Sequence, residues 1–327
     1  METCISAPQV ASVCRNGSWS IRSATSPKRS IRMTRNPGAA TVPEVIDRTL
    51  APLVPAKDFK AIVGVIDAGV ISIDGPHPRI SACLDRVSLI DDNLDRLPEP
   101  GLSLSPADGH GTFVVGRILQ ETDDALVMSR RGLDLGSRDA DAVVADWLDS
   151  FTVLDPSVRP QVVNLSFYGD EFEPPAGIGR ALLGLLDAAP DVVVVTSAGN
   201  RWTDVPPWPA AFHRDLERHR ERVVAVGAVD TSILRPLGVS DPPRASFSNS
   251  WPGIQLWAPG VRVVGPYARA TEDGFEFCSA IWSGTSFAAA TVTGVLARGV
   301  AAGGKAPDVL ADLVSNGPVV LASDTTW

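Results

Sequence analysis

From residue 61 onward, short apolar runs alternate with longer segments of helical periodicity. The first run, AIVGVID at Ala61–Asp67, is continuous and rich in β-branched residues, which is typical of a strand buried on both faces. Further runs of this kind lie at Val162–Phe167, Asp191–Asn200, Arg222–Asp230 and Gln255–Gly260. Helices are predicted at Gly111–Gln120, Asp139–Phe151, Gly177–Ala189 and Thr285–Ala301. This alternation predicts a three-layer α/β/α fold, with helices on both faces of a mainly parallel central sheet.

The first 56 residues differ from the rest, because they show no periodicity and are rich in Ser, Arg, Thr and Pro. We expect an N-terminal extension over residues 1–56, either disordered or a short pro-segment, followed by one folded domain over residues 57–327. The extension contains no apolar run of the length that a secretory signal needs, so a cytoplasmic location is expected. An organellar transit peptide and a true start at Met33 are the alternatives.

The composition narrows the classes of partner and cofactor. With 29 basic residues against 38 acidic ones, the net charge of −9 disfavours nucleic acid as a partner. No apolar segment is long enough to predict a membrane span. The cysteines, Cys4, Cys14, Cys83 and Cys278, form no C-x-x-C pair, so no metal site is expected. We expect free thiols, with a Cys83–Cys278 disulfide as the alternative.

Several predicted strands end in polar residues, at the edge where open parallel sheets bind their ligands. These residues are Asp67, Ser166 and Asn200. Taken alone, Asp67 and Asn200 also fit an ordinary role in a turn. His110 differs from the other histidines because glycines flank it at the start of a predicted helix, which leaves its ring accessible.

Ser286 lies in the sequence SGTS before an Ala-rich helical segment and admits two interpretations. Its hydroxyl either caps the helix by accepting a backbone N–H, or is a nucleophile that the preceding Gly-Thr turn directs into a cleft. Together, Asp67, His110, Asn200 and Ser286 match the needs of acyl transfer. That reaction requires a nucleophile, its base, a carboxylate that orients the base, and a donor for the oxyanion.

The motifs VIDAG, DGHGTFVVG, VVNLSFYG, TSAGN and SGTSFAAATVTG, in this order, resemble those of the subtilisin-like serine peptidases. The resemblance implies a subtilisin-like fold, a triad of Asp67, His110 and Ser286, and Asn200 in the oxyanion hole. It also implies substrate-binding residues, namely Ser166, Phe167, Tyr168 and Gly169 in a segment that pairs with the substrate backbone, and Ser197, Ala198 and Gly199 in a pocket wall. The implied partner is a protein or peptide substrate, and the oligomeric state is left open.

The chain departs from the usual family pattern around the triad. The family's DSG or DTG is DAG here, so the residue after Asp67 has no hydroxyl. Phe113 replaces a second histidine, Phe287 replaces a methionine, and Ala290–Thr291 replace Pro-His. These changes lie outside the triad, so we expect activity to survive. Tyr168 stands where the family often has glycine and is expected to narrow the neighbouring pockets.

Two further segments carry weaker signals. Glu121–Ala125, ETDDA, is acidic and lies near a place where relatives often bind structural calcium. No cofactor is expected, and calcium is kept as the alternative. Phe212–Glu221, FHRDLERHRE, is mostly charged and predicts a solvated surface helix, with a docking element as the alternative.

As a whole, the sequence predicts a serine endopeptidase that uses an Asp-His-Ser triad and an Asn oxyanion hole. A dedicated processing protease inside the cell is the narrower version of this prediction. The alternative is a catalytically silent subtilisin-like protein that binds peptides without cutting them.

Overall fold

The central element of the fold is a parallel sheet. The computed structural model describes residues 59–70, 109–132, 141–168, 174–232, 242–267 and 278–317 with their side chains, together with Glu44 and the backbone of the other strand and helix residues given below. The strands are β6 (Ala61–Asp67), β7 (Val87–Leu89), β8 (Ala125–Arg131), β9 (Val162–Leu165), β10 (Val193–Ser197), β11 (Val223–Val229) and β12 (Ile254–Pro259). They pair in the order β12-β11-β10-β9-β6-β8-β7, and every pairing is parallel. Since β6 lies inside the sheet, its last residue, Asp67, is flanked by strands on both sides.

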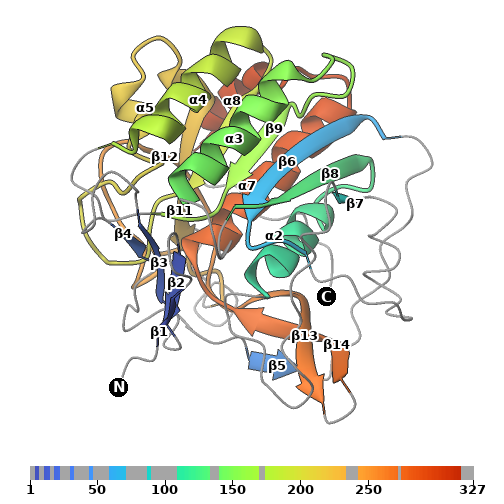
Figure 1. Cartoon of the computed structure of the whole chain (residues 1–327), viewed down its shortest axis with the longest axis vertical. Coiled ribbons are helices and arrows are strands. Elements are labelled where there is room, and N and C mark those ends of the chain that lie inside the picture. The colour runs from blue at the N-terminus through green and yellow to red at the C-terminus, as the bar shows by residue number, and fades with distance from the viewer. Residues whose placement is uncertain are drawn as a thin grey trace.

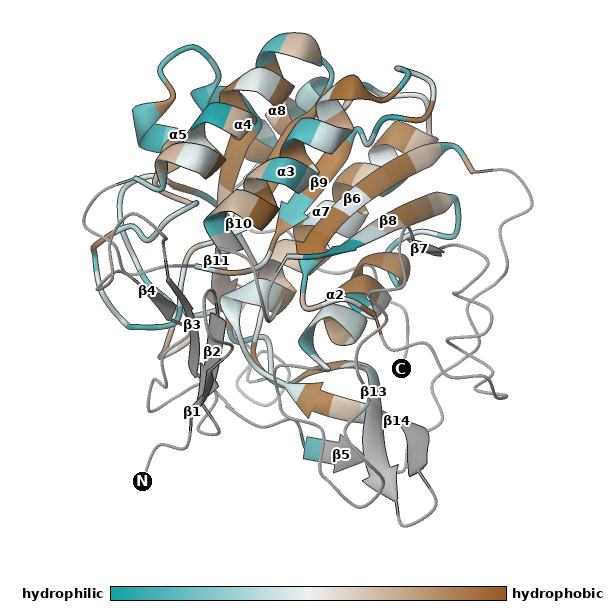
Figure 2. Cartoon of the chain, in the orientation of Figure 1, coloured by the Kyte–Doolittle hydropathy of each residue, from teal (hydrophilic) through white to brown (hydrophobic). Residues whose placement is uncertain are grey.

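Helices cover both faces of the sheet, which confirms the predicted three layers. The helices are α2 (His110–Leu119), α3 (Ala140–Val153), α4 (Ala176–Ala188), α5 (Phe212–Asp215), α7 (Thr285–Ala301) and α8 (Ala306–Asn316). Figure 1 shows α3 and α4 in front of the strands, with α7 running behind them. Figure 2 shows that apolar residues are concentrated in the strands between these layers.

The side chains of β6 alternate between the two faces, as the pleat of a strand requires. Val63 and Val65 pack with residues of α2 and α7. Ile62 and Ile66 pack with residues of α3 and α4. The strand is therefore buried on both sides, as its continuous apolar run predicts.

An antiparallel hairpin outside the central sheet packs against α2. It consists of β13 (Val263–Thr271) and β14 (Gly274–Trp282), with β5 (Glu44–Ile46) pairing on β14. Figure 1 shows the hairpin beneath α2. Two glycines of this region permit the close approach, because a Cβ at Gly109 would lie 2.0 Å from the Tyr267 ring and one at Gly116 would lie 2.0 Å from Pro266. The start of α2 is thus held against the hairpin.

Four short strands lie near the N-terminus. They are β1 (Cys4–Ser6), β2 (Ala11–Cys14), β3 (Ser18–Arg22) and β4 (Ser30–Arg32), and they pair antiparallel in that order. The remaining parts of residues 1–56 lie almost wholly outside the described residues. The division into an extension and one domain therefore stays a prediction.

The prediction of one solvated surface helix over Phe212–Glu221 is wrong. The segment forms the short helix α5 and a separate 3₁₀ turn at Arg220–Arg222. Phe212 is buried, and its ring lies 4.6 Å from that of Trp208. Charge dominates the sequence of this segment, but one aromatic side chain anchors it to the core, which the charge pattern does not reveal.

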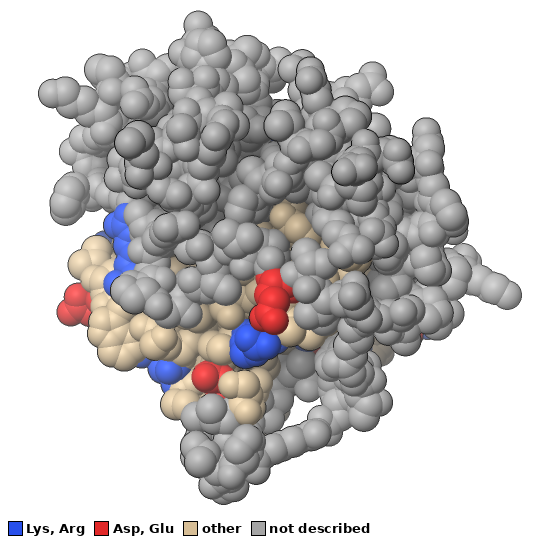
Figure 3. Space-filling view, turned by 90° about the horizontal axis from the view of Figure 1, so that it is seen from below, with Lys and Arg blue, Asp and Glu red and all other residues tan. Residues whose placement is uncertain are grey.

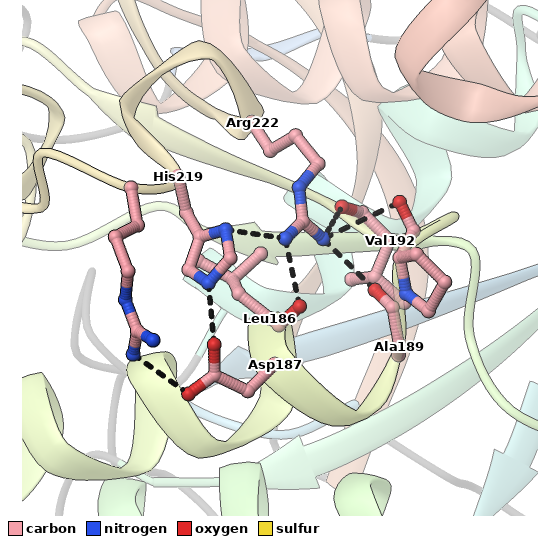
Figure 4. A network of polar contacts seen from close by, with 8 residues as sticks. Leu186, Asp187, Ala189, Val192, His219 and Arg222 are labelled. Atoms are coloured by element: carbon pink, nitrogen blue, oxygen red, sulfur yellow. Dashed lines mark hydrogen bonds and ion pairs between the residues drawn. The ribbon is translucent and has the colours of Figure 1, made fainter.

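Arg222 anchors the other end of this segment at the carboxyl end of α4 (Figure 4). Its guanidinium donates to the carbonyl oxygens of Leu186 at 2.7 Å and Ala189 at 2.9 Å. It also donates to His219 Nδ1 at 2.7 Å, and His219 Nε2 lies 2.6 Å from an oxygen of Asp187. Burial is the main cause that lowers the pKa of Arg222 below its usual value. Because the last carbonyls of a helix have no intrahelical partner, this cation stabilises the end of α4.

A buried ion pair at the carboxyl end of α2 contacts α7 on both sides. Arg117 of α2 is 3% exposed, and its Nε donates to Thr291 Oγ1 of α7 at 3.1 Å. Its other nitrogens bind Gln120 Oε1 at 2.6 Å and the carboxylate of Glu121. Burial lowers the pKa of Arg117, and the adjacent Glu121 opposes that shift. Arg298 of α7 adds a second cation 3.6 Å from Glu121.

We expect Glu121→Met to destabilise the fold by about 3–5 kcal/mol, because it leaves a buried guanidinium without its carboxylate. The double variant Arg117→Met/Glu121→Met should recover most of this loss, since it removes both buried charges. Urea denaturation measures both. Arg180→Met is the control, because Arg180 and Asp149 form an exposed pair that should contribute at most about 1 kcal/mol. A Glu121→Met variant no less stable than the control would contradict the ion pair's role.

Candidate active site

The carboxylate of Asp67 and the imidazole of His110 are hydrogen-bonded at the carboxyl edge of the sheet. Asp67 ends β6, His110 begins α2, and the distance from Nδ1 to Oδ1 is 2.8 Å. The two residues are 0% and 1% exposed. A carboxylate can only accept, so Nδ1 carries the proton in this bond and Nε2 is left as the basic nitrogen. The arrangement orients the ring and fixes its tautomer.

Ser286 lies in the first turn of α7, and its hydroxyl does not cap that helix. The N-cap residue is Gly284, and the cap makes no side-chain hydrogen bond. The Ser286 hydroxyl instead donates to the carbonyl oxygen of Ser166 at 2.9 Å. The Ser166 hydroxyl lies 3.0 Å from the carbonyl oxygen of Ser286 and 2.8 Å from Asn164 Oδ1, and its single proton is shared between these two acceptors. The carboxyl end of β9 and the start of α7 are therefore in direct polar contact.

The start of α7, where Ser286 lies, also contacts His110. Phe287, the next residue, has its ring centroid 5.5 Å from that of His110. A hydroxyl has one proton, and in this rotamer Ser286 donates it to Ser166. The hydroxyl must therefore turn its proton away from Ser166 before it can donate to His110. The backbone already places the two residues on adjacent helix ends.

Asn200 faces the turn that precedes Ser286. Its Oδ1 accepts from the N–H of Thr285 at 2.9 Å and from the Thr285 hydroxyl at 2.8 Å. Because Oδ1 takes these two donors, Nδ2 points the other way, and a Cβ built at Gly284 would lie 3.5 Å from it. The N–H of Ser286 is among the first amides of α7, which have no intrahelical acceptor. Asn200 Nδ2 and the N–H of Ser286 thus lie at the same turn as the Ser286 side chain.

Thr285 holds together the turn between Gly199–Asn200 and the start of α7, a role that its sequence pattern does not predict. Its side-chain oxygen donates to Asn200 and accepts from the N–H of Gly199 at 3.1 Å. Gly199 has a φ of 95°, a conformation that favours glycine. The only sequence signal for Thr285 is its place in SGTS, between the glycine of the turn and the serine.

The predicted substrate-binding residues surround the same edge. Ser166 contacts Ser286 as described, and the Ser197 hydroxyl donates to the carbonyl oxygen of Phe167 at 3.4 Å. Ala198 and Tyr168 are both 0% exposed. The Tyr168 side chain is thus enclosed within the protein. That it narrows the neighbouring pockets stays a prediction. Gly169 lies outside the described residues.

The acidic segment at Glu121–Ala125 uses its carboxylates for ion pairs. Glu121 binds Arg117, and Asp124 lies 3.4 Å from Lys60. Within the described ranges, no three metal-ligating side chains come together. The same part of the chain contains no helix that is long and apolar enough to cross a membrane. Cys278 lies on β14, but Cys83 lies outside the described residues, so their redox state stays a prediction.

The chain is similar to proteins of one known family. Residues 59–306 match the model of the subtilase family, Peptidase_S8. Among solved structures, the chain is similar to the prenylagaramide maturation protease PagA, with 19% identity and a TM-score of 0.54 over 79% of this chain and 84% of that one. It is also similar to the subtilase cytotoxin SubAB, with 21% identity and a TM-score of 0.58 over 80% and 83% of the two chains.

A third similar structure is the patellamide maturation protease PatA, with 20% identity and a TM-score of 0.52 over 79% of this chain and 85% of that one. A search of curated proteins found no match. At such low sequence identity, these structures show only that the fold is shared. The family model, in contrast, matches most of the chain and shows the family. The chain therefore belongs to the subtilase family of serine peptidases.

Proposed function

We propose that the protein is an endopeptidase in which Ser286 is the nucleophile, His110 its base, Asp67 the residue that orients the base, and Asn200 an oxyanion donor. The observation that carries this proposal is the buried 2.8 Å hydrogen bond between Asp67 and His110. The His110 ring also contacts Phe287, the residue next to Ser286. Each residue has the chemical type that its role requires, and all four lie at the same edge of the sheet.

The geometry supports a stepwise acyl transfer. Ser286 rotates away from Ser166 and donates its proton to His110 Nε2 while its Oγ attacks the scissile carbonyl. The carbonyl oxygen becomes an oxyanion, which Asn200 Nδ2 and the N–H of Ser286 stabilise. His110 then gives the proton to the leaving amine. Water hydrolyses the acyl-enzyme by the same sequence of proton transfers, and Asp67 stabilises the imidazolium throughout.

The catalytic assignment predicts that a fluorophosphonate probe labels Ser286. Labelling should disappear in Ser286→Ala and in His110→Ala, because both remove part of the nucleophile–base pair. Asn200→Ala should slow labelling about 10²–10³-fold, the effect of removing one oxyanion donor. Mass spectrometry identifies the labelled residue, and Ser315→Ala is the control because Ser315 is exposed on α8. A folded protein that stays unlabelled would instead support a catalytically silent peptide-binding protein.

We further propose a restricted substrate range, as in a processing protease. Two of the similar structures are maturation proteases, PagA and PatA. The side chains of Asp67, His110 and Ser286 are at most 1% exposed, and an extended flexible segment fits so enclosed a site better than a folded surface does. The described part of one face carries both basic and acidic side chains (Figure 3).

The restricted range predicts that a proteome-derived peptide library is cut at few sequences, which share residues on both sides of the cleaved bond. The cleaved peptides are read by mass spectrometry, with Ser286→Ala as the blank. Cleavage of many unrelated sequences would contradict the restricted range but not the catalytic assignment.

Asp67 also has an unused hydrogen-bonding capacity. Its Oδ1 accepts from His110 and from the N–H of Ala68 at 2.7 Å. Its Oδ2 is buried, and no donor in the described part of the chain reaches it. The residue after Asp67 is alanine, whereas relatives often have a hydroxyl there. The missing hydroxyl and the unsatisfied oxygen therefore belong to neighbouring residues.

We expect Ala68→Ser to place a donor beside Oδ2 and to raise stability by about 1 kcal/mol. The fluorophosphonate labelling rate should rise as well, because the carboxylate is held more firmly. Ala68→Thr and Ala68→Val form a matched pair that separates the hydroxyl from the added volume. Equal stability and equal rates in that pair would show that the hydroxyl does not bind Asp67.

A further inference from the structure

The hydrogen bond between Asp67 and Nδ1 orients the imidazole of His110, but a bond to one ring atom does not by itself fix the tilt of the ring. Two aromatic side chains contact the ring and supply further constraints. Trp282 lies with its centroid 5.6 Å from that of His110, at an interplanar angle of 84°. Phe287 lies at 5.5 Å and 40°. These separations fall within the range of attractive aromatic contacts.

Both aromatic residues belong to the segment that carries the nucleophile. Trp282 is the last residue of β14, and Phe287 lies in the first turn of α7. Ser286 lies between them in the sequence. The two rings also touch each other, with centroids 5.1 Å apart. The segment therefore contacts the base on both sides of Ser286, so that the position of the ring and that of the nucleophile depend on the same few residues.

Trp282 is itself held rigidly. Its ring is 5.6 Å from Phe113 of α2 and 5.9 Å from Tyr267 of β13, nearly perpendicular to each. It is 5% exposed, and its backbone pairs with Val263 in the hairpin. Because Trp282 contacts the hairpin, α2 and His110, the position of the hairpin constrains the position of the His110 ring.

The cluster also unites two departures from the family pattern. Phe113 stands in place of a histidine and Phe287 in place of a methionine, and their rings lie 4.5 Å apart. Each touches Trp282. A Cβ at Gly265 would lie 2.8 Å from the Phe113 ring, so the hairpin backbone closes over the cluster directly. These substitutions, far apart in the sequence, thus form one aromatic unit beside the base.

We propose that Trp282 is a positioning residue for His110, which together with Phe287 fixes the plane of the imidazole so that Nε2 faces Ser286. This inference rests on the proposed catalytic roles of His110 and Ser286. The physical reason is that proton transfer requires a defined geometry, and a misplacement of about 1 Å can cost on the order of 10²-fold in rate.

The test compares variants of Trp282 by the kinetics of fluorophosphonate labelling. Saturation curves give the maximal rate of inactivation, kinact, and the half-saturating probe concentration, KI. We expect Trp282→Met to lower kinact about 10- to 100-fold with KI unchanged, because the probe still binds but the base is misplaced. Trp282→Phe should restore most of the rate, since it keeps an aromatic ring.

Trp251→Met is the matched control. Trp251 is 6% exposed, close to the value for Trp282, and packs with Ala210 and Ala225 rather than with His110. The control should lose stability, seen as a lower Tm, but keep kinact. If Trp282→Met does not fold, Phe287→Ala replaces it in the comparison, because it removes the other ring that contacts His110, and the same fall in kinact is expected.

Three results would overturn the inference. The first is a kinact for Trp282→Met equal to that of Trp251→Met, which would assign the residue to packing alone. The second is a rise in KI without a fall in kinact, which would make Trp282 a substrate contact. The third is a Trp282→Phe variant as slow as Trp282→Met. Wild-type protein that is not labelled at Ser286 would instead refute the proposed function.

Discussion

The packing of α2 against α7 over the end of β6 is the constraint on which the site depends. β6 supplies Asp67, α2 supplies His110 and α7 supplies Ser286. A small shift between the two helices would move His110 relative to Ser286. The interface resists such a shift in two ways. Further along the helices, Arg117 binds Thr291 and Arg298 lies near Glu121, and at the helix ends lies the aromatic cluster. Polar and apolar interactions thus secure the same geometry at different points.

Much of this architecture follows from the sequence, because a buried parallel strand leaves a continuous apolar run. The predicted run at Ala61–Asp67 is β6 itself, and the predicted helix at Thr285–Ala301 is α7. The polar residues that end the strands were likewise identifiable, since they interrupt apolar runs at one edge of the sheet. Asp67, His110, Asn200 and Ser286 all lie at that edge.

The remaining features depend on contacts between distant residues. β8 was missed because its run ends in two arginines. Arg130 is nevertheless buried, and its guanidinium stacks on Trp147 and Phe151, at 5.3 and 5.7 Å. The β13–β14 hairpin was missed because its stability comes from pairing and from contact with α2, not from a regular alternation. No spacing in the sequence indicates that Trp282, Phe113 and Phe287 meet. The cytoplasmic location stays a prediction.

Phe287 has a consequence for the chemistry that the site tolerates. A methionine next to the nucleophile carries a thioether that peroxide converts to a sulfoxide, which is polar and bulkier. Phenylalanine offers no sulfur to such an oxidant. Met128, the methionine that the structure describes, packs in the apolar layer with α3 and α4, on the face of the sheet opposite α7. Phe287 therefore contacts His110 and, unlike a methionine, presents no thioether next to Ser286 that peroxide could oxidise.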